Sequence, residues 1–433
     1  MAQTVFRNLQ IRWWLFRGKR KRQKKLPAEA IRYFEKVLAL DPKRVIALAH
    51  IGACRYDLNE YQTAIEVLER ALQIAPHYSE VHAHLAQVYM MLGLYQEAYD
   101  SAHRAFRMLP KFKRNLHWLD VLGYCCSETN RWEEAAETYQ IMTNLNARYA
   151  RAWHGLGWAY SHLGRDLDAV AAYERAIELP PDNPASYCEL GSTYFNLKRF
   201  REAAERFKAC CRLSPDNAGA HYSLGQTFRE LREFSSAVEP ILQALKIGPR
   251  FAEVYLTLGA TYAELGRHEE ARNAFEEAVK LEPHTTIDYC SLATCCMRLG
   301  KGTEAREAIE QALRLDPNSA DAYACLGNLL HEPGTFDKAA KAYVKSLELD
   351  PDRFETLANL GDAYLELGRV KDSKDVLTQA EKIRSNDPRL HLLLGAVYLK
   401  LGDRDSALRE YEIVKQQDRS KAEELGKLIN PST

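Results

Sequence analysis

An all-α fold built from stacked helix pairs is predicted by three features of this 433-residue sequence. The first is a 34-residue period that runs through eleven consecutive blocks. The second is the residue pattern inside a block, where position 7 is Leu or Ile, position 8 is Gly in nine blocks, and position 20 is Ala in ten. The third is Pro at position 32 in eight blocks, which ends a helix because proline cannot continue one. The blocks begin at Val45, Ser79, Leu116, Ala150, Pro184, Ala218, Ala252, Thr286, Ala320, Phe354 and Pro388.

Each block is expected to hold two short helices, because its apolar residues recur three and four positions apart. Positions 4, 7, 8 and 11 share one face of a first helix, and positions 20, 24 and 27 share one face of a second. The small residues at positions 8 and 20 are expected where the two helices approach closely, since a larger side chain would push them apart. The block from Ala150 illustrates the pattern with Trp153, Leu156, Gly157, Tyr160, Ala169, Tyr173 and Pro181.

These residues resemble the tetratricopeptide repeat, a 34-residue unit with the pattern W-x2-L-G-x2-Y, A-x3-F and P. The resemblance covers residues 45–421, and a degenerate half-repeat precedes it with Ala30, Phe34 and Pro42 at positions 20, 24 and 32. It implies an α-α superhelix, or solenoid, of about eleven tandem helix-turn-helix repeats, with the first helices lining a concave groove. It implies no particular chemistry, because packing residues define the family.

The period also sets the expected domain organisation. Residues 1–25 form a basic and apolar segment, 26–44 the half-repeat, 45–112 repeats one and two, and 116–421 repeats three to eleven. The insertion at 113–115 (Lys113, Arg114 and Asn115) is expected to make residues 111–115 a bend or a small basic knob. A capping helix over 420–430 is expected to close the array, because Ser420 and Glu423 have capping-box spacing. Its apolar residues are Ala422, Leu425, Leu428 and Ile429.

Ten cysteines are present, and several occupy packing positions, where a small apolar core thiol is the expected state. These are Cys126, Cys210 and Cys296. Free thiols fit a reducing cytoplasm. The adjacent cysteine pairs lack the C-x2-C spacing of a zinc site, so neither a metal nor a cofactor is expected.

No catalytic motif appears in the sequence. It lacks a G-x-S-x-G elbow, a P-loop, a dinucleotide-binding glycine motif and H-E-x-x-H. The repeats also occupy most of the chain. The sequence therefore predicts a protein that is not an enzyme.

Charge is concentrated at the start of the chain, where residues 1–25 hold nine basic residues and no acidic one. The apolar stretch before this cluster is far shorter than the roughly 20 residues that a membrane-spanning helix needs. The cluster is a predicted anionic-surface site, with Trp13, Trp14 and Phe16 beside it to insert at an interface. A disordered tail, or a first helix packed on the array, is the alternative. The clustered residues are Arg17, Lys19, Arg20, Lys21, Arg22, Lys24 and Lys25.

Large aromatic and polar residues gather at the positions that the resemblance places in the groove, namely 2, 5, 9 and 12. We predict that four rings from successive repeats form an aromatic track that holds a partner segment, because aromatic residues in concave surfaces are typical binding anchors. The alternative is that the rings merely cover the seam between helices. The predicted partner-binding residues are Tyr124, Trp158, Phe195, Tyr222, His117, Arg151, His154 and Gln226.

Two known specialisations of the family are not predicted. Members that bind chaperone C-termini use Lys at position 5, Asn at positions 9 and 6, then Lys and Arg at positions 2 and 6 of successive repeats. Here Arg151 and Asn359 are interpreted as isolated fragments of that set. Members fused to an O-linked glycosyltransferase carry an Asn ladder at position 6, which this sequence lacks.

The sequence thus predicts a cytoplasmic interaction scaffold that binds a peptide segment or a helix of a partner protein in its groove and organises a multiprotein assembly. The alternative is an adaptor, peripheral to the membrane or associated with nucleic acid, that is recruited through residues 1–25. Of these two binding partners, nucleic acid is less favoured than the anionic membrane surface. Self-association is compatible with both interpretations.

Overall fold

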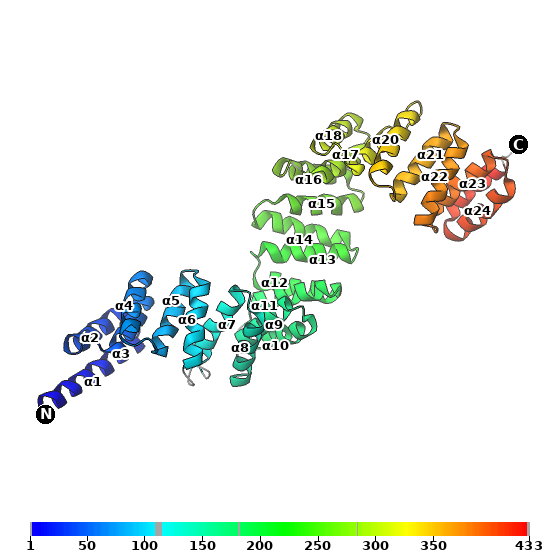
Figure 1. The fold of residues 1–433 in the computed structure, drawn as a ribbon. Coiled ribbons are helices and arrows are strands. Elements are labelled where there is room, and N and C mark those ends of the chain that lie inside the picture. The colour runs from blue at the N-terminus through cyan, green and yellow to red at the C-terminus, as the bar shows by residue number, and fades with distance from the viewer. Residues whose placement is uncertain (1, 109–114, 181, 284, 431–433) are drawn as a thin grey trace. The chain divides into compact units, whose positions relative to one another are not determined.

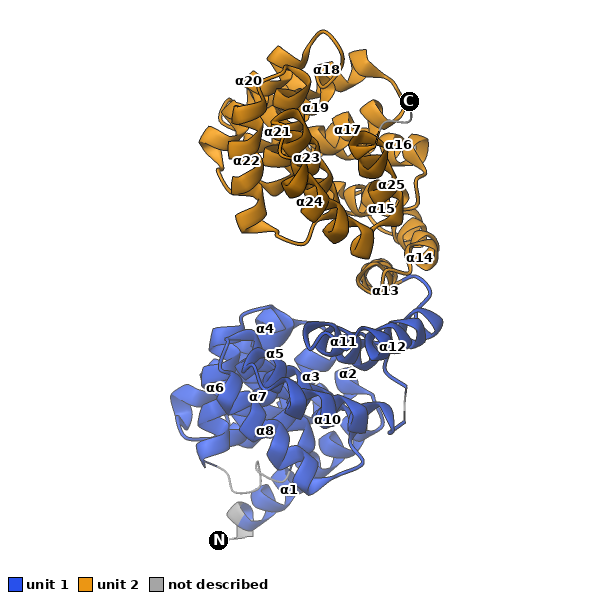
Figure 2. Ribbon diagram, turned by 90° about the vertical axis from the view of Figure 1, so that its right-hand side faces the viewer, with its two compact units in different colours: residues 1–216 blue, residues 217–433 orange. Residues whose placement is uncertain are grey.

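The computed structural model describes residues 2–108, 115–180, 182–283 and 285–430, which form 25 α-helices and no strand (Figure 1). The predicted all-α fold is confirmed. The chain divides into two compact units, residues 1–216 and residues 217–433 (Figure 2). The insertion residues Lys113 and Arg114, and most of the bend expected at 111–115, lie outside the described residues.

Unit 1 consists of helices that pair in sequence order, each first helix packing on the second helix that follows it. They are α1 (Ala2–Gln23), α2 (Pro27–Leu40), α3 (Val45–Asp57), α4 (Tyr61–Ile74), α5 (Ser79–Met91), α6 (Tyr95–Met108), α7 (Leu116–Glu128), α8 (Trp132–Leu145), α9 (Ala150–His162), α10 (Asp166–Ile177), α11 (Pro184–Asn196) and α12 (Phe200–Leu213).

Unit 2 continues the same pairing and ends with an extra helix. Its helices are α13 (Ala218–Glu230), α14 (Phe234–Ile247), α15 (Ala252–Glu264), α16 (His268–Leu281), α17 (Thr286–Arg298), α18 (Gly302–Leu315), α19 (Ala320–Leu329), α20 (Phe336–Leu349), α21 (Phe354–Glu366), α22 (Val370–Ile383), α23 (Pro388–Lys400), α24 (Arg404–Gln417) and α25 (Arg419–Ile429).

The helix boundaries follow the sequence period. From α3 onward, every first helix begins at position 1 of its block and every second helix at position 17. Position 15, in the turn between them, is left-handed in each repeat. Seven of these turns contain Gly, and the others contain a residue with a side chain, such as Lys198 with φ 58° and Arg232 with φ 58°. A residue other than glycine costs about 1–2 kcal/mol in this conformation.

The close approach predicted at positions 8 and 20 is confirmed. A Cβ atom added to Gly191 would come within 2.9 Å of Phe207 Cε1, and one added to Gly157 within 2.7 Å of Tyr173 Cδ1. Position 20 is completely buried in each repeat, including Ser373, whose hydroxyl donates to the Gly361 carbonyl at 2.6 Å. Eight of the nine glycines at position 8 therefore make room for the large residue at position 24 of the same repeat, whereas Gly395 makes room for Leu425 of α25.

Helices α1 and α2 together form one more repeat, which begins at Ile11. In that register Trp14 falls at position 4 and Gly18 at position 8, and a Cβ on Gly18 would come within 2.6 Å of Phe34 Cε1. Ile11 and Trp14 pack in one core cluster with Phe34. Of the alternatives for residues 1–25, the structure shows a packed first helix, which completes the half-repeat expected at 26–44.

The C-terminal helix differs from its prediction in the capping residue. Asp418, rather than Ser420, caps α25, because its carboxylate accepts from the Lys421 backbone N–H at 3.1 Å. Glu423 contacts Arg419 at 3.3 Å instead of reaching back to Ser420. The apolar side of α25 is buried through Ala422, Leu425 and Ile429, whereas Leu428 is exposed.

Candidate functional site

The candidate site is the first-helix wall, which we define within each unit as the surface formed by positions 2, 5, 6 and 9 of the first helices. In unit 2 this wall is hollowed by a cavity of about 480 Å³ between α17, α19 and α21. Small side chains at these positions leave the space open. The cavity is lined by Ile287, Cys290, Ser291, Thr294, Asp321, Ala324, Cys325, Asn328, Arg353, Glu355, Thr356 and Asn359.

Polar side chains at this cavity are held by one another. Asn359 Nδ2 donates to Asn328 Oδ1 at 2.8 Å, and the Tyr343 hydroxyl donates to the same oxygen at 2.9 Å. Arg353 forms an ion pair with Asp321 at 2.5 Å. The interpretation of Asn359 as isolated was wrong, because position 9 of one first helix contacts position 6 of the next. Sequence reasoning missed Asn328 because it did not combine these two positions across neighbouring repeats.

Two thiols also line the cavity, those of Cys290 and Cys325. The Cys325 thiol donates to the Cys290 carbonyl at 3.9 Å, and Thr294 Oγ1 lies 4.0 Å from the Cys325 sulfur. Hydrogen bonding with Cys325 and burial both raise the pKa of the Cys290 thiol. Cys290 is therefore protonated at neutral pH.

The first helices of unit 1 carry three of the predicted aromatic residues, at positions 9 and 12, and each of them packs against another ring. Tyr124 lies edge-on to Tyr95, with centroids 6.0 Å apart, and Phe195 lies edge-on to Phe200 at 5.3 Å. Tyr124 and Phe195 are half-buried. Their partners occupy position 17, the start of a second helix, which the sequence interpretation did not consider.

Trp158 is half-buried in a cluster of three rings. It lies edge-on to Trp132 at 5.4 Å and to His162 at 5.7 Å. Trp132 stacks on His162, with centroids 3.9 Å apart and planes inclined by 17°. Trp132 is at position 17 of the preceding repeat, where α8 begins. An aromatic residue at that position is the sequence feature that could have predicted this cluster.

The predicted polar residues of unit 1 link neighbouring first helices. His117 on α7 is hydrogen bonded to Gln87 on α5, and Arg151 on α9 contacts Asp120 on α7 at 3.0 Å. His154 Nδ1 lies 3.0 Å from the Ser186 hydroxyl on α11. Burial lowers the pKa of His154 to about 4, so this imidazole is neutral at pH 7.

Tyr222 and Gln226 belong to α13 of unit 2, so the predicted four-ring track is divided between the two units. The Tyr222 hydroxyl donates to Glu253 Oε1 at 3.0 Å and lies 3.0 Å from Thr257 Oγ1 on α15. Both Tyr222 and Gln226 are half-buried. A partner role for all eight predicted residues stays a prediction.

The seven clustered basic residues have different surroundings. Lys21 forms an ion pair with Glu29 at 2.6 Å, and the Arg17 guanidinium lies 5.3 Å from the Trp13 ring centroid. Lys19, Arg22 and Lys25 line a separate pocket. Arg20 and Lys24 are exposed.

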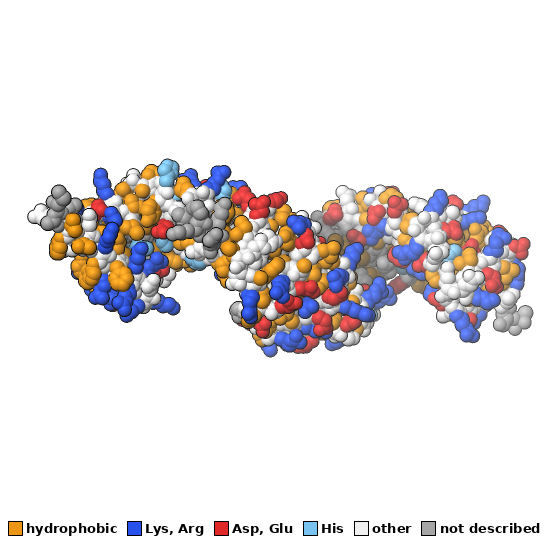
Figure 3. Space-filling model, turned by 90° about the horizontal axis from the view of Figure 1, so that it is seen from below, with side chains coloured by type: hydrophobic (Ala, Val, Ile, Leu, Met, Phe, Trp, Pro, Cys, Tyr) orange, Lys and Arg blue, Asp and Glu red, His pale blue; other side chains and the backbone are white. Residues whose placement is uncertain are grey.

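The outer side of α1 is apolar as well as basic. Exposed apolar side chains follow one another at helical spacing, and Phe6 is 63% exposed. On the face shown in Figure 3, the N-terminal part carries basic and apolar side chains with few acidic ones. Trp13, at position 3 of its repeat, is exposed, whereas position 3 is buried in ten of the other repeats. The exposed side chains are Val5, Phe6, Leu9, Trp13 and Phe16.

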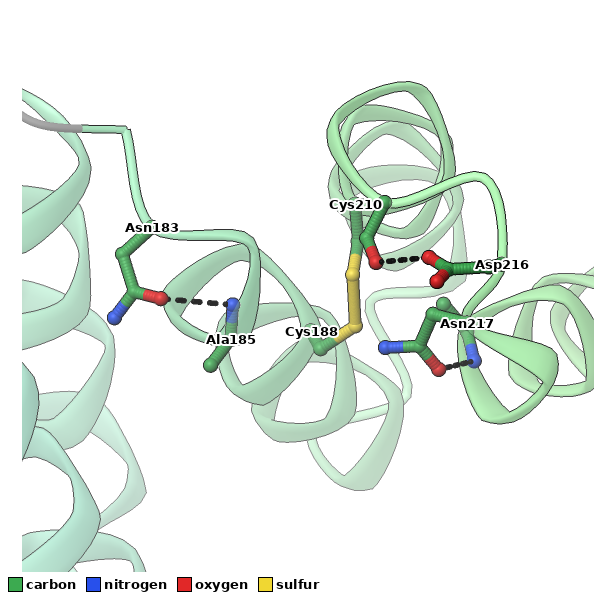
Figure 4. The surroundings of a disulfide bond; sticks show 8 residues. Asn183, Ala185, Cys188, Cys210, Asp216 and Asn217 are labelled. Carbon is green, nitrogen blue, oxygen red and sulfur yellow. Dashed lines mark hydrogen bonds between the residues drawn. A yellow bond between two sulfur atoms is a disulfide. The ribbon is translucent and has the colours of Figure 1, made fainter.

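One cysteine expected as a free thiol is oxidised in the structure. Cys188 on α11 forms a disulfide with Cys210 on α12, with Cα atoms 5.7 Å apart (Figure 4). The prediction for Cys210 was wrong because position 5 of the first helix faces position 27 of the second within this repeat, where Cys188 is its partner. Cys126 and Cys296 are free and buried, as predicted. A cytoplasmic location stays a prediction.

Within the described residues, no group of three or more His, Cys, Asp or Glu side chains is placed to hold a metal ion. Among the described helices, none combines the length and the hydrophobicity that a transmembrane span requires.

Comparison with known proteins gives one family and a set of similar folds. The family model of the cilia and flagella-associated protein 70 C-terminal domain, a tetratricopeptide repeat model, matches residues 47–253 and again residues 248–427. No curated protein matches the chain.

Among solved structures, a tetratricopeptide repeat protein from Parabacteroides merdae is 17% identical with a TM-score of 0.50, covering 57% of this chain and 98% of its own. The structure of the Cut9-Hcn1 hetero-tetramer of APC/C is 16% identical with a TM-score of 0.49, and the match covers 97% of this chain and 96% of the other. Yeast Tom70 is 16% identical with a TM-score of 0.45, and the match covers 97% of this chain and 94% of Tom70.

Proposed function

Because the chain belongs to the tetratricopeptide repeat family of the cilia and flagella-associated protein 70 C-terminal domain, we propose that it is a non-catalytic scaffold that binds a segment of a partner protein. The observation that carries this proposal is the cavity of about 480 Å³ in the first-helix wall of unit 2. The wall offers a recess lined mainly by small side chains, together with polar groups held in fixed positions. Binding sites of this kind combine an open recess with a few oriented polar groups.

The chemistry of the cavity favours an extended polypeptide as the bound segment. Asn359 and Asn328 present amide groups, which both donate and accept hydrogen bonds, as a peptide backbone does. Arg353 and Asp321 at the same cavity neutralise one another. The third charged lining residue, Glu355, is paired with Arg384 at 2.9 Å. An uncharged stretch of backbone therefore matches the surface better than a strongly charged one.

The proposal is tested by closing the cavity without changing the fold. Ala324 lines the cavity, so Ala324→Arg fills it, whereas Gln379→Arg adds the same charge at an exposed position on α22. Partners captured by the wild-type chain should be retained by Gln379→Arg and lost with Ala324→Arg, as measured by quantitative mass spectrometry. Equal capture by both variants, with helical content unchanged, would place the binding surface elsewhere.

The aromatic wall of unit 1 is a second surface for the same function. Trp158→Ala is expected to reduce capture of a partner that binds there, because truncating a true anchor typically costs about 2 kcal/mol or more. The matched control is Trp153→Phe, at the neighbouring packing position of the same helix. Wild-type affinity in Trp158→Ala would remove Trp158 from the site.

A second candidate function is recruitment to an anionic membrane through α1. The observation that favours it is the exposed apolar row beside basic residues, where Phe6 and Phe16 are 63% and 61% exposed. Aromatic and apolar side chains with adjacent Lys and Arg are typical of helices that lie in a membrane interface. Vesicle flotation separates the possibilities, because equal binding to neutral and acidic lipids, or no binding, contradicts the idea.

A further inference from the structure

A second cavity, which we call the N-terminal pocket, lies between the end of α1, the turn after it and α3. Its volume is about 860 Å³. It is distinct from the exposed apolar side of α1 and belongs to the extra repeat that begins at Ile11. The pocket is lined by Lys19, Arg22, Gln23, Lys25, Pro27, His50, Asp57 and Leu58.

The register of the extra repeat explains why cations surround this pocket. Counting from Ile11, Lys19 is at position 9, Arg22 at position 12 and Lys25 at position 15. Position 9 belongs to the first-helix wall in the other repeats. The basic residues on this side of α1 therefore continue the wall of unit 1.

The charges around the pocket do not balance. Arg22 Nε contacts Asp57 Oδ2 at 2.8 Å, which fixes the guanidinium and neutralises one charge. Asp57 is the single acidic residue among those that line the pocket, so the ammonium groups of Lys19 and Lys25 have no carboxylate left to balance them there. A net excess of two positive charges therefore faces the cavity.

His50 adds a polar group that the protein itself does not satisfy. Both of its ring nitrogens are buried from solvent and neither has a hydrogen-bond partner among the described residues. Its ring stacks on Phe34, with centroids 5.1 Å apart, which holds its position. Burial, with the nearby Lys19, lowers the pKa of His50 to about 3, so its ring is neutral at pH 7.

We propose that the N-terminal pocket binds a multiply phosphorylated polyol, as a free molecule or as a lipid headgroup. A phosphate monoester carries about −1.5 to −2 charges and three acceptor oxygens, which suits several cations converging on one cavity. A single carboxylate has one charge and would leave part of this excess unmatched. An extended acidic peptide would need cations spaced along its length rather than gathered around one cavity.

The test uses inositol hexakisphosphate as the soluble probe in isothermal titration calorimetry on the full chain. Lys19→Gln/Lys25→Gln removes the two unbalanced pocket charges. Arg20→Gln/Lys24→Gln removes the same charge from exposed positions nearby that do not line the pocket. The pocket variant is expected to lose at least about tenfold in affinity, or about 1.4 kcal/mol, whereas the control should change by less than about twofold.

Vesicles identify the source of the phosphate groups. If the ligand is a lipid headgroup, vesicles with phosphatidylinositol bisphosphate should bind better than phosphatidylserine vesicles of equal charge, and the pocket variant should lose this difference. If only the soluble probe binds, the ligand is a free phosphorylated polyol. Equal losses in both double variants, or no binding of either probe, would overturn the proposal. These outcomes are independent of partner capture by unit 2, which Ala324→Arg tests separately.

Discussion

The first-helix wall is built from the same repeat positions in both units, yet it is filled by aromatic rings in repeats three and four and hollow in repeats eight to ten. At position 9, unit 1 has Tyr124 and Trp158, which pack on rings of the preceding repeat. Unit 2 has Thr294 and Asn328 at that position, beside a cavity of about 480 Å³. The size of the side chain at the wall decides whether the wall offers a recess.

This difference changes how an aromatic residue in a repeat groove should be interpreted. A large ring at position 9 finds a neighbour when position 17 of the preceding repeat is also aromatic, as Trp132 is for Trp158. Such a ring then stabilises the joint between repeats as well as presenting an edge to a partner. A row of small residues is less conspicuous in a sequence, but it is the feature that leaves space for a partner segment.

The largest expected difference between the two walls concerns cysteine at position 5. Cys188 in unit 1 is bonded to Cys210, whereas Cys290 in unit 2 is a free thiol. Cys188→Ser/Cys210→Ser should destabilise unit 1 by about 3 kcal/mol, because the bond closes a loop of 22 residues in the unfolded chain. Cys290→Ser/Cys325→Ser is the matched control in unit 2.

Urea unfolding followed by tryptophan fluorescence measures this effect, because all six tryptophans lie in unit 1. Thiol counting after denaturation without reductant provides an independent check, with eight reactive thiols expected. Titration of all the cysteines as thiols would show that Cys188 and Cys210 are reduced.

The packing of the two walls is compared by replacing a large side chain with a small one in unit 1 and a small side chain with a larger one in unit 2. Trp158→Ala should destabilise unit 1 by about 2 kcal/mol, less than for a fully buried tryptophan, because its ring is half-buried. Ala324→Leu, at the cavity of unit 2, should change stability by less than about 0.5 kcal/mol because space is already present there. Thermal unfolding by circular dichroism measures both. A similar loss in the two variants would contradict the distinction between a filled and a hollow wall.

The two units should also respond to pH in opposite directions. Burial lowers the pKa of His84 in unit 1 to about 4, from 6.5 in the unfolded chain. The unfolded state therefore binds more protons between these values, and this contribution to stability is intact above pH 6.5 and lost as pH falls towards the folded value. At a pH of about 5.5 the expected loss is about 1.4 kcal/mol.

His391 in unit 2 shows the reverse behaviour. Hydrogen bonding to Glu410 raises its pKa, and its Nδ1 lies 2.7 Å from Glu410 Oε2. Its contribution is therefore complete below pH 6.5 and lost as pH rises through the folded value. Urea titrations at pH values of about 5.5, 7 and 8.5 should show that His84→Gln reduces the acid-side loss by about 1.4 kcal/mol, while the shares of His50 and His154 remain. His391→Gln should remove its own contribution to the loss on the alkaline side. Unchanged pH profiles in these variants would rule out the assignment.

The smallest expected effect concerns a feature that the units share. Lys198→Gly in unit 1 and Arg232→Gly in unit 2 should each stabilise the protein by about 0.5–1 kcal/mol, because both residues adopt the left-handed conformation at position 15. Gly164→Lys, at the same position of another repeat, is the reverse control and should destabilise by a similar amount. Chemical denaturation measures all three. A loss of stability in the two glycine variants would mean that their side chains make contacts that outweigh the backbone strain.

The repeat positions were predictable from the sequence because they depend on packing within one repeat. Gly191 and Ser373 illustrate this, since the space at positions 8 and 20 is set by the helix pair itself. The extra N-terminal repeat was also readable, because Trp14 and Gly18 have the spacing of positions 4 and 8. Its basic residues obscured that pattern, since Arg17 stands where the other repeats have Leu or Ile.

The surroundings of the wall residues were not predictable in the same way, because they depend on pairs from different helices. The disulfide of Cys188 requires position 5 to face position 27, and the Asn328 and Asn359 contact requires positions 9 and 6 of adjacent repeats. The 34-residue period indicates which residue types recur at each position, but it does not indicate which residues of different helices are in contact. The cavities follow from those contacts and were not predicted.

The left-handed turn at position 15 has a consequence for how such a chain can change in length. Every repeat passes from its first to its second helix through the same backbone conformation. A chain cut at this position in one repeat and rejoined at the same position of another would therefore meet a matching turn. Tandem duplication or loss of 34-residue segments is conformationally neutral at such a junction, so recombination can add or remove binding surface in whole modules.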